Sequence, residues 1–307
     1  MAGKAGQAPR PVRNDVSQPG EEVLVLRHQK LKKGEHETFY QISRAGVWPW
    51  FEKIGARVVG QWQIVYPDGE GEPEGYDEGY RLARYASFEH WQHTRPPANI
   101  GLGGDGLDNA ANTKALKDRN EVLIGSDGPF FLQGHMGPDR PYYMPGLEEQ
   151  YELMDGSETD VQPARSNVEQ PGQEVVTLRY WKVKKGSFDE FYQASLEGVW
   201  PYFQKVGARI VGQWKVIYPP PRACDRKESS DFDEVLMMTR YASYEHWQAT
   251  RQSAVLGGDG PDYDKLQEAI ALRRSLQLET SVRFMQGYMY HSPPKYLPSL
   301  NERYRRN

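Results

Sequence analysis

The sequence predicts an α+β protein made of two similar domains in tandem. Three observations lead to this prediction. An internal repeat spans most of the chain, each copy alternates strand-like and helix-like periodicity, and 307 residues suffice for two domains of ordinary size. Hydrophobic residues make up 38% of the chain and charged residues 26%, which is typical of a folded globular protein.

The internal repeat is strongest at an offset of 152 residues. Of the 45 positions in residues 23–67, 26 are identical in residues 175–219, and no gap is needed. The match resumes from Arg84 onward at an offset of 156. We therefore predict one domain over residues 11–150 and a second over residues 163–300.

The first copy begins with a predicted strand over residues 23–31, where apolar and β-branched residues alternate. A helix follows, because residues 39–47 carry an apolar stripe at helical spacing. Trp48 precedes Pro49, and the residue before a proline disfavours helical geometry. We therefore expect this helix to break at Trp48.

The rest of the copy predicts two strands, two helices and a last strand. The strands cover residues 57–66 and 80–86, separated by an acidic, glycine-rich loop. Ser87 is the expected N-cap of the next helix, residues 108–120 form another, and residues 130–136 form the last strand. This order, β-α-β-β-α-α-β, is that of a ferredoxin-like domain.

Composition excludes several classes of protein. The formal net charge is −4, which does not favour binding to nucleic acid or anionic lipid. A single cysteine, Cys224, excludes an internal disulfide framework and a cysteine-rich zinc module. No stretch approaches 18 apolar residues, and residues 1–19 lack the apolar centre of a signal peptide. We expect a cytoplasmic protein with no membrane span and a small-molecule partner; association into a homo-oligomer is left open.

Short motifs in both copies resemble the NIPSNAP family of the dimeric α+β barrel superfamily. In the first copy they are Val25-Leu26-Arg27, Lys33-Gly34, Gly46, Val59-Gly60-Gln61-Trp62 and Tyr85-Ala86-Ser87. In the second they are Leu178-Arg179, Lys185-Gly186, Gly198, Val211-Gly212-Gln213-Trp214 and Tyr241-Ala242-Ser243. The resemblance implies that two ferredoxin-like units enclose a barrel, here a pseudo-dimeric one within one chain. Relatives in the superfamily include cofactor-free monooxygenases, isomerases and lyases, haem-binding enzymes, and members without established activity.

Arg27 and Arg179 are the first candidates for chemistry. Alternation along the first strand predicts that Arg27 points into the barrel with Val25, whereas His28 faces the helices. A buried guanidinium needs an anion or a carbonyl group as partner. The alternatives are an ion pair with a carboxylate of the other half, or a role in binding substrate and its developing negative charge.

The two copies differ in the last strand, where His135 is replaced by Tyr288. An imidazole and a phenol at equivalent positions could act as acid and base on one molecule. The alternative is that both are structural residues. Gln133 and Gln286 alternate in phase with them and are candidates for substrate binding.

Four further residues are candidates for substrate binding. Trp48 and Trp200 precede a proline at the expected helix break, so we place them at a cavity mouth. Gln61 and Gln213 belong to the repeated Val-Gly-Gln-Trp segment. Aromatic side chains around a cavity would favour an apolar or aromatic ligand.

Metal and cofactor signals are weak. His90 and His93 have helical spacing, but the second copy has Ala249 at the second position, so we predict no metal and expect His90 to pack and cap. Residues 103–108 fit a calcium repeat that works only in stacked turns, so we expect a tight loop there, with a mobile flap as alternative. Haem is an alternative cofactor, with His135 as axial ligand.

The sequence thus predicts an enzyme without a cofactor, a lyase, isomerase or monooxygenase acting on an apolar or aromatic carbonyl compound. One alternative is a non-catalytic ligand-binding or interaction protein. The other is a haem-binding enzyme.

Overall fold

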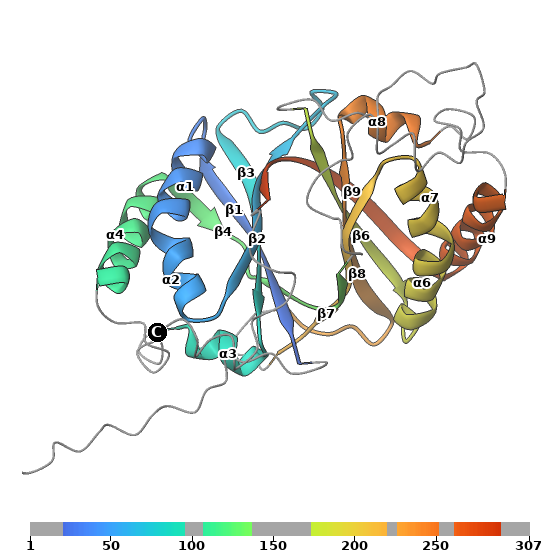
Figure 1. Cartoon of the computed structure of the whole chain (residues 1–307), viewed down its shortest axis with the longest axis horizontal. Coiled ribbons are helices and arrows are strands. Elements are labelled where there is room, and N and C mark those ends of the chain that lie inside the picture. The colour runs from blue at the N-terminus through green and yellow to red at the C-terminus, as the bar shows by residue number, and fades with distance from the viewer. Residues whose placement is uncertain (1–20, 96–106, 137–172, 220–225, 252–260, 290–307) are drawn as a thin grey trace, which may run out of the picture. The chain divides into compact units, whose positions relative to one another are not determined.

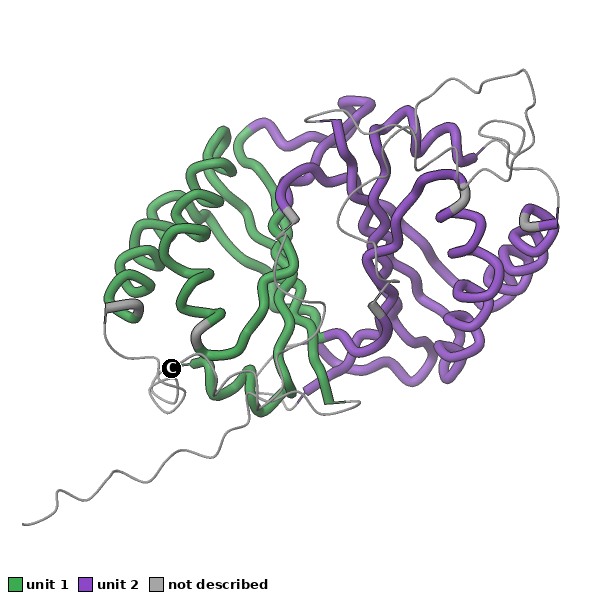
Figure 2. Tube along the Cα trace, viewed as in Figure 1, with its two compact units in different colours: residues 1–61, 75–131, 292–307 green, residues 62–74, 132–291 purple. Residues whose placement is uncertain are grey.

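A computed structural model describes residues 21–95, 107–136, 173–219, 226–251 and 261–289 (Figure 1). The chain divides into two compact units (Figure 2). Unit 1 comprises Met1–Gln61, Gly75–Phe131 and Ser292–Asn307, and unit 2 comprises Trp62–Glu74 and Leu132–His291. The closing of the two halves into a barrel concerns the placement of these units and stays a prediction.

Unit 1 is built on an antiparallel sheet. Strand β1 (Val23–Lys32) pairs with β3 (Tyr76–Tyr85) on one side and with the short β4 (Leu123–Ser126) on the other. Strand β2 (Arg57–Val65) is the next neighbour of β3. The order β4-β1-β3-β2 is that of a ferredoxin-like sheet, as predicted, although β4 itself was not predicted.

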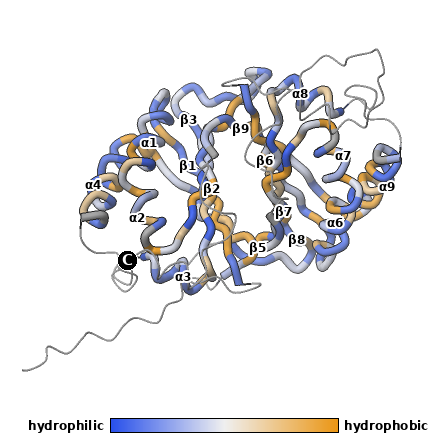
Figure 3. The backbone as a smooth tube through the Cα atoms, viewed as in Figure 1, coloured by the Kyte–Doolittle hydropathy of each residue, from blue (hydrophilic) through white to orange (hydrophobic). Residues whose placement is uncertain are grey.

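Helices cover one face of this sheet (Figure 1). The chain after β1 forms α1 (His36–Ile42), a π-helical turn η1 (Ser43–Val47) and α2 (Trp48–Lys53). Helix α4 (Leu107–Val122) alternates hydrophilic and hydrophobic residues (Figure 3). Helix α4 packs so closely against η1 that only glycine fits at position 46: a Cβ on Gly46 would lie 2.5 Å from the Cβ of Ala115.

The predicted helix break at Trp48 is wrong, because the helix continues through the π turn. The backbone N–H of Trp48 donates to the carbonyl oxygen of Ser43, five residues earlier. Pro49 then occupies the first turn of α2, where a missing N–H costs little. The hydroxyl of Ser43 donates to the carbonyl oxygen of Phe39 at 2.6 Å and satisfies a buried backbone group.

Helix α3 (Phe88–His93) begins as the sequence predicted. The hydroxyl of Ser87 accepts a hydrogen bond from the backbone N–H of His90 at 3.0 Å, which makes Ser87 the N-cap. The ring of His90 is fully buried, its Nδ1 accepts from the N–H of Ala86 and its Nε2 contacts the carbonyl oxygen of Ile54 at 2.8 Å. His90 therefore packs and caps, as expected.

Unit 2 repeats this design. Its antiparallel sheet has the order β9-β6-β8-β7, and three helical segments follow β6 before a long helix near the end. Its elements are β6 (Val175–Lys184), α6 (Phe188–Ala194), η3 (Ser195–Val199), α7 (Trp200–Lys205), β7 (Arg209–Ile217), β8 (Phe232–Tyr241), α8 (Tyr244–Ala249), α9 (Pro261–Leu276) and β9 (Gln277–Met289).

The compact units do not coincide with the limits of the sequence repeat. Unit 2 includes the end of β2 with the loop that follows it, and the end of β5 (Phe130–Met136); all of these belong to the first copy. Within unit 2, β5 lies close against β7: a Cβ on Gly134 would be 2.5 Å from the carbonyl oxygen of Gln213. The last strand of the first copy thus packs with the second copy's sheet.

The predicted faces of the first strand in each copy are reversed. In unit 2, Trp181 and Val183 belong to the same buried cluster as Phe191 of α6 and Leu266 of α9. The odd-numbered residues of β6, and with them Arg179, therefore face the helices. The strand pattern was ambiguous because both faces of this sheet are rich in buried apolar side chains.

The structure confirms the α+β class. Among the described residues, no helix is long and apolar enough to cross a membrane.

Candidate functional site

A cluster of four arginines lies on the helix-covered face of unit 1. Arg27 of β1 and Arg81 of β3 are directly opposite each other in the antiparallel register, so their side chains share one face. The guanidinium of Arg81 lies 5.3 Å from the ring centroid of Phe51 in α2. Arg119, in the last turn of α4, lies 4.2 Å from the ring centroid of Phe39 in α1.

Arg95 and Tyr85 complete this cluster, which we call the unit 1 arginine cluster. Arg95 follows α3, and its guanidinium lies 4.7 Å from the ring centroid of Trp91. Its charge acts on both Arg27 and Arg81. Tyr85 is fully buried at the end of β3, four residues after Arg81, so both side chains lie on the same face of the strand. Aromatic faces thus hold three of the four guanidinium groups in place.

Burial and mutual repulsion weaken the hold of these arginines on their protons. Burial first, and then the charges of Arg81 and Arg95, lower the pKa of Arg27 to about 10. Burial lowers the pKa of Arg119 to about 9, with further contributions from Arg81 and Arg27. The pKa of Arg81 is lowered by its burial. Both printed values lie above neutral pH, so Arg27 and Arg119 remain cationic there.

No carboxylate compensates this charge in the described ranges. None of the ion pairs there involves Arg27, Arg81, Arg95 or Arg119. Arg81 is 3% exposed and Arg119 6% exposed, yet Nε of Arg81 and both Nε and Nη1 of Arg119 have no hydrogen-bond partner there. The Tyr85 hydroxyl has none either. Buried donors of this kind ordinarily bind an anion or a carbonyl oxygen.

Unit 2 carries a related cluster of three arginines, the unit 2 arginine cluster. Arg273 of α9 lies over the rings of Trp181 and Phe191, at 4.8 and 4.5 Å from their centroids. Burial, followed by the charge of Arg179, lowers the pKa of Arg273 to about 9. Arg251 lies 4.6 Å from the centroid of Trp247, and its charge lowers the pKa of Arg179, although burial of Arg179 contributes more.

In the sheet of unit 2, a buried glutamine stands in the same row as the first-strand arginine. In unit 2, Arg179, Met237 and Gln213 are paired across three adjacent strands, so all three face the helices. Gln213 is fully buried, and neither polar atom of its amide has a partner among the described residues; the same holds for Gln61 in unit 1. The structure therefore brings the predicted residues Gln213 and Arg179 onto one face.

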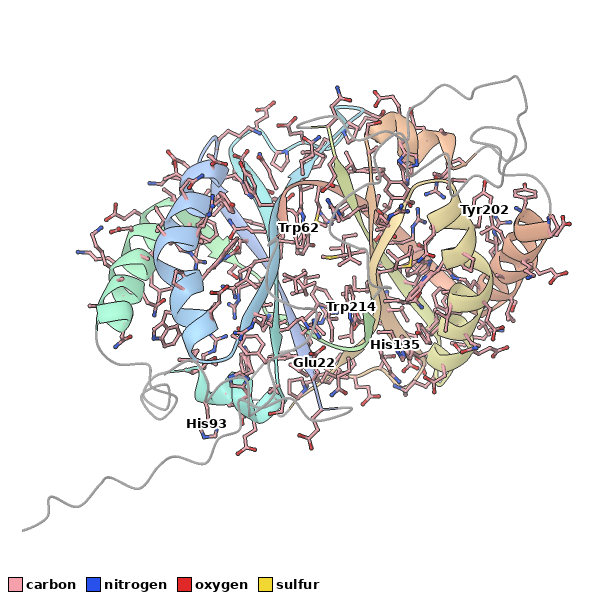
Figure 4. All side chains as sticks on the ribbon, viewed as in Figure 1. Glu22, Trp62, His93, His135, Tyr202 and Trp214 are labelled. Atoms are coloured by element: carbon pink, nitrogen blue, oxygen red, sulfur yellow. The ribbon has the colours of Figure 1, made fainter. Side chains whose placement is uncertain are left out.

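His135, unlike these residues, is not buried. It is exposed at the end of β5, and its ring stacks on Tyr192 of α6, with centroids 3.7 Å apart and planes 9° apart (Figure 4). Partial burial lowers the pKa of His135, and the nearby Asp189 opposes this shift. Haem with His135 as axial ligand stays an alternative prediction.

Three other predicted site residues, Tyr288, Trp48 and Trp200, lie outside the arginine clusters described above. Tyr288 is 40% exposed on β9. Trp48 and Trp200 are 1% and 3% exposed and pack edge-on against Tyr40 and Tyr192 in the helix layer. Their predicted position at a cavity mouth is therefore wrong, because the continuous helix places them in the core.

A cavity of about 410 Å³ opens elsewhere in unit 2. Its lining includes Gln286, a predicted binding residue, and Glu245 in the first turn of α8. Gln133 is half-buried on β5 and does not line it. Within the described ranges no group of three His, Cys, Asp or Glu side chains is arranged for a metal ion. The Gly-Asp loops with calcium-like spacing fall outside those ranges.

Sequence reasoning missed most of both clusters. Arg95, Arg119 and their equivalents in the second copy look like ordinary surface residues in the sequence. The available signal was their repetition: Arg95 and Arg251 are 156 residues apart, and Arg119 and Arg273 are 154 apart, the offsets of the flanking repeat segments. Arginines at equivalent positions of the two copies are the pattern that indicates these clusters.

Comparison with known proteins shows distant structural likeness. Sequence comparison finds no matching family model and no match among curated proteins. A structure described as a "putative monooxygenase" from Lactobacillus acidophilus NCFM is 10% identical over 87% of this chain and 93% of its own, with a TM-score of 0.49. One with the same description from Fusobacterium nucleatum is 11% identical over 90% and 100%, with a TM-score of 0.46.

An anthrone oxidase-like protein is 13% identical over 89% of this chain and 94% of its own, with a TM-score of 0.46. With TM-scores below 0.5, these likenesses carry no conclusion about the function of this chain. The NIPSNAP resemblance stays a prediction.

Proposed function

We propose that this chain is an enzyme that binds a small anionic or carbonyl compound at its arginine clusters and stabilises negative charge developing on an oxygen atom. The observation that carries the proposal is that buried Arg81 and Arg119, on the helix-covered face of unit 1, form no ion pair with any residue that the structure describes and keep donors without a partner there. Burying such groups without partners costs free energy. A ligand anion would recover that free energy.

The chemistry follows from the donors present. When a base, here water or hydroxide from solvent, accepts the proton from the carbon next to a carbonyl group, the electron pair of that C–H bond becomes the enolate and its negative charge moves to the carbonyl oxygen. Fixed cationic donors lower the barrier of such a step by stabilising the oxygen anion. The aromatic rings of Phe39 and Phe51, which support the guanidinium groups, would also suit an apolar or aromatic ligand. An enolate step is compatible with each of the predicted classes: lyase, isomerase and cofactor-free monooxygenase.

Enolate formation can be tested without knowing the natural substrate. The probe is 4-acetylbenzoate in D₂O, whose methyl protons exchange for deuterium when its enolate forms, followed by ¹H NMR at pH 7.5. We expect the wild-type chain to accelerate this exchange. The variant Arg273→Met should abolish the contribution of unit 2, and Arg27→Met that of unit 1.

The adjacent Arg274 supplies a matched control, because it lies on the same helix but is exposed. Arg274→Met should leave the exchange rate unchanged, and circular dichroism should show all variants folded. Equal exchange rates in wild type, Arg27→Met and Arg273→Met would contradict the proposal. His135→Ala and Tyr288→Phe, measured in the same way, test the predicted acid–base pair.

A ligand-binding protein without catalysis is the second candidate, and the same clusters favour it, since they would hold an anion whether or not it reacts. Native mass spectrometry of the purified chain separates the candidates when combined with the exchange assay. A retained anion without any acceleration of exchange would favour binding alone.

A further inference from the structure

The two arginine clusters differ at one position of the sheet. Three arginines are shared between them at equivalent positions, and Tyr85 corresponds to Tyr241. The residue that faces the first-strand arginine differs: Arg27 is paired with Arg81 in unit 1, whereas Arg179 is paired with Met237 in unit 2. Among the described residues, the unit 1 arginine cluster therefore has four guanidinium groups and the unit 2 arginine cluster has three.

Arg81 is costly where it stands. Like charges directly opposite each other in an antiparallel sheet destabilise it. Here both belong to buried or largely buried side chains, and Arg95 and Arg119 add charge of the same sign. No carboxylate within the described part of the chain forms an ion pair with Arg81, and its Nε has no hydrogen-bond partner there.

The second copy shows that the fold does not need an arginine at this position. Met237 is 4% exposed and belongs to the buried cluster with Trp181 and Phe191. The first-strand residue opposite this position is an arginine in both copies, Arg27 beside Arg81 and Arg179 beside Met237. An apolar side chain thus fills the position in the same backbone, so packing does not explain Arg81.

We propose that Arg81 makes the unit 1 cluster selective for a doubly charged anion, whereas the unit 2 cluster takes a singly charged one. This inference rests on the proposed function, because it assigns a substrate class to the same clusters. The fitting ligand of unit 1 carries two carboxylates, or one group with two negative charges. Guanidinium groups suit both, since each offers paired N–H donors to two oxygens.

The test uses two probes of almost equal size and different charge. Phthalate has two negative charges at pH 7.5, and monomethyl phthalate has one. Isothermal titration calorimetry at constant ionic strength should show one tight phthalate site in the wild-type chain, at least tenfold tighter than either site for monomethyl phthalate. A charge-assisted hydrogen bond contributes enough free energy for a change of this size.

Exchanging the two residues between the copies should move the selectivity with them. Arg81→Met should remove the preference for phthalate, and Met237→Arg should create a second tight phthalate site. Arg81→Gln keeps a polar side chain of similar length and provides a second variant if Arg81→Met does not fold. Arg274→Met should leave both affinities unchanged.

Two results would overturn the inference in distinguishable ways. Equal affinities of the two probes in wild type, or an unchanged preference in Arg81→Met and Arg81→Gln, would contradict the charge selectivity and leave the proposed function intact. Binding of neither probe, together with absent exchange of 4-acetylbenzoate, would contradict both.

Discussion

The helix-covered faces of units 1 and 2 keep one set of residues and change another. Pairs such as His90 and His246 make the same buried hydrogen bonds in both copies. By contrast, Arg81 and Met237 occupy the same place in the sheet with opposite chemistry. Comparing the two copies therefore distinguishes residues that stabilise the fold, which are the same in both, from residues proposed to select the ligand, which differ.

The largest effect on stability should come from the buried histidine of unit 2. Its Nδ1 accepts from the N–H of Ala242, so the ring is neutral, and burial lowers the pKa of His246 to about 4. The unfolded chain binds a proton near pH 6.5, so the free energy of unfolding falls as the pH drops from 6.5 to 4. The loss contributed by this residue is about 3 kcal/mol.

Urea unfolding of unit 2 at pH 7 and pH 4.5, followed by hydrogen exchange with mass spectrometry, checks this expectation. His246→Asn keeps an acceptor for the N–H of Ala242 but does not titrate. The variant should therefore lose less stability than wild type between the two pH values. An equal loss would show that other groups govern the acid sensitivity of unit 2.

Adding a methyl group at the helix crossing should have the next largest effect, and it should differ between the units. A Cβ on Gly198 would lie 2.5 Å from the Cβ of Ala269 and 2.7 Å from the carbonyl oxygen of Lys265. A Cβ on Gly46 meets a backbone oxygen only at 3.1 Å. We expect Gly198→Ala to cost about 2–3 kcal/mol and Gly46→Ala about 1–2 kcal/mol.

Gly75→Ala is the control for both variants, because a Cβ there meets no atom within 4 Å. Its free energy of unfolding should match that of wild type. If Gly46→Ala were the more damaging of the two variants, the closer contact in unit 2 would not be the deciding one.

Removing the N-caps should have a smaller and equal effect in both units. Ser87 and Ser243 accept the backbone N–H of the histidine three residues later at 3.0 and 3.1 Å. Ser87→Ala and Ser243→Ala should each cost about 1 kcal/mol in chemical unfolding. Unequal costs would mean that α3 and α8 differ in how strongly they are held by the rest of their units.

The smallest effect should come from an exposed ion pair. Lys182 contacts Glu279 at 2.6 Å, with both side chains reaching solvent. Glu279→Gln should change the free energy of unfolding by less than about 0.5 kcal/mol, and added salt should reduce even that. A larger cost would mark the β6–β9 pairing as more sensitive to charge than the other elements.

The sequence predicted the order of the elements well, because strand and helix periodicities are local. It did not predict β4, whose residues 123–126 are short and partly exposed. It also predicted the wrong end for the first helix, since a π turn carries the helix through Trp48 and Pro49 lies in the first turn of α2. The face of β1 depended on which side the helices cover, and no local pattern decides that when both faces are apolar.

The sequence predicted only part of the site, because the other part depends on contacts between strands and not on a local pattern. Arg27, Arg179, Gln61 and Gln213 were singled out, and the structure gives them buried or half-buried positions. Arg81 was not, because it has no counterpart in the second copy and an arginine in a strand is ordinarily a surface residue. Its significance emerges only from the cross-strand register.

The π turn between α1 and α2 also determines how the arginine cluster is supported. A π turn holds one residue more than a regular turn, so it shifts every following side chain by about 100° around the helix axis. Deleting one residue from Ser43–Val47 would let the helix run on as regular α. Phe51 would then rotate away from Arg81, and the ring that orients this guanidinium would be lost. The orientation of Arg81 thus depends on a single surplus residue in a neighbouring helix.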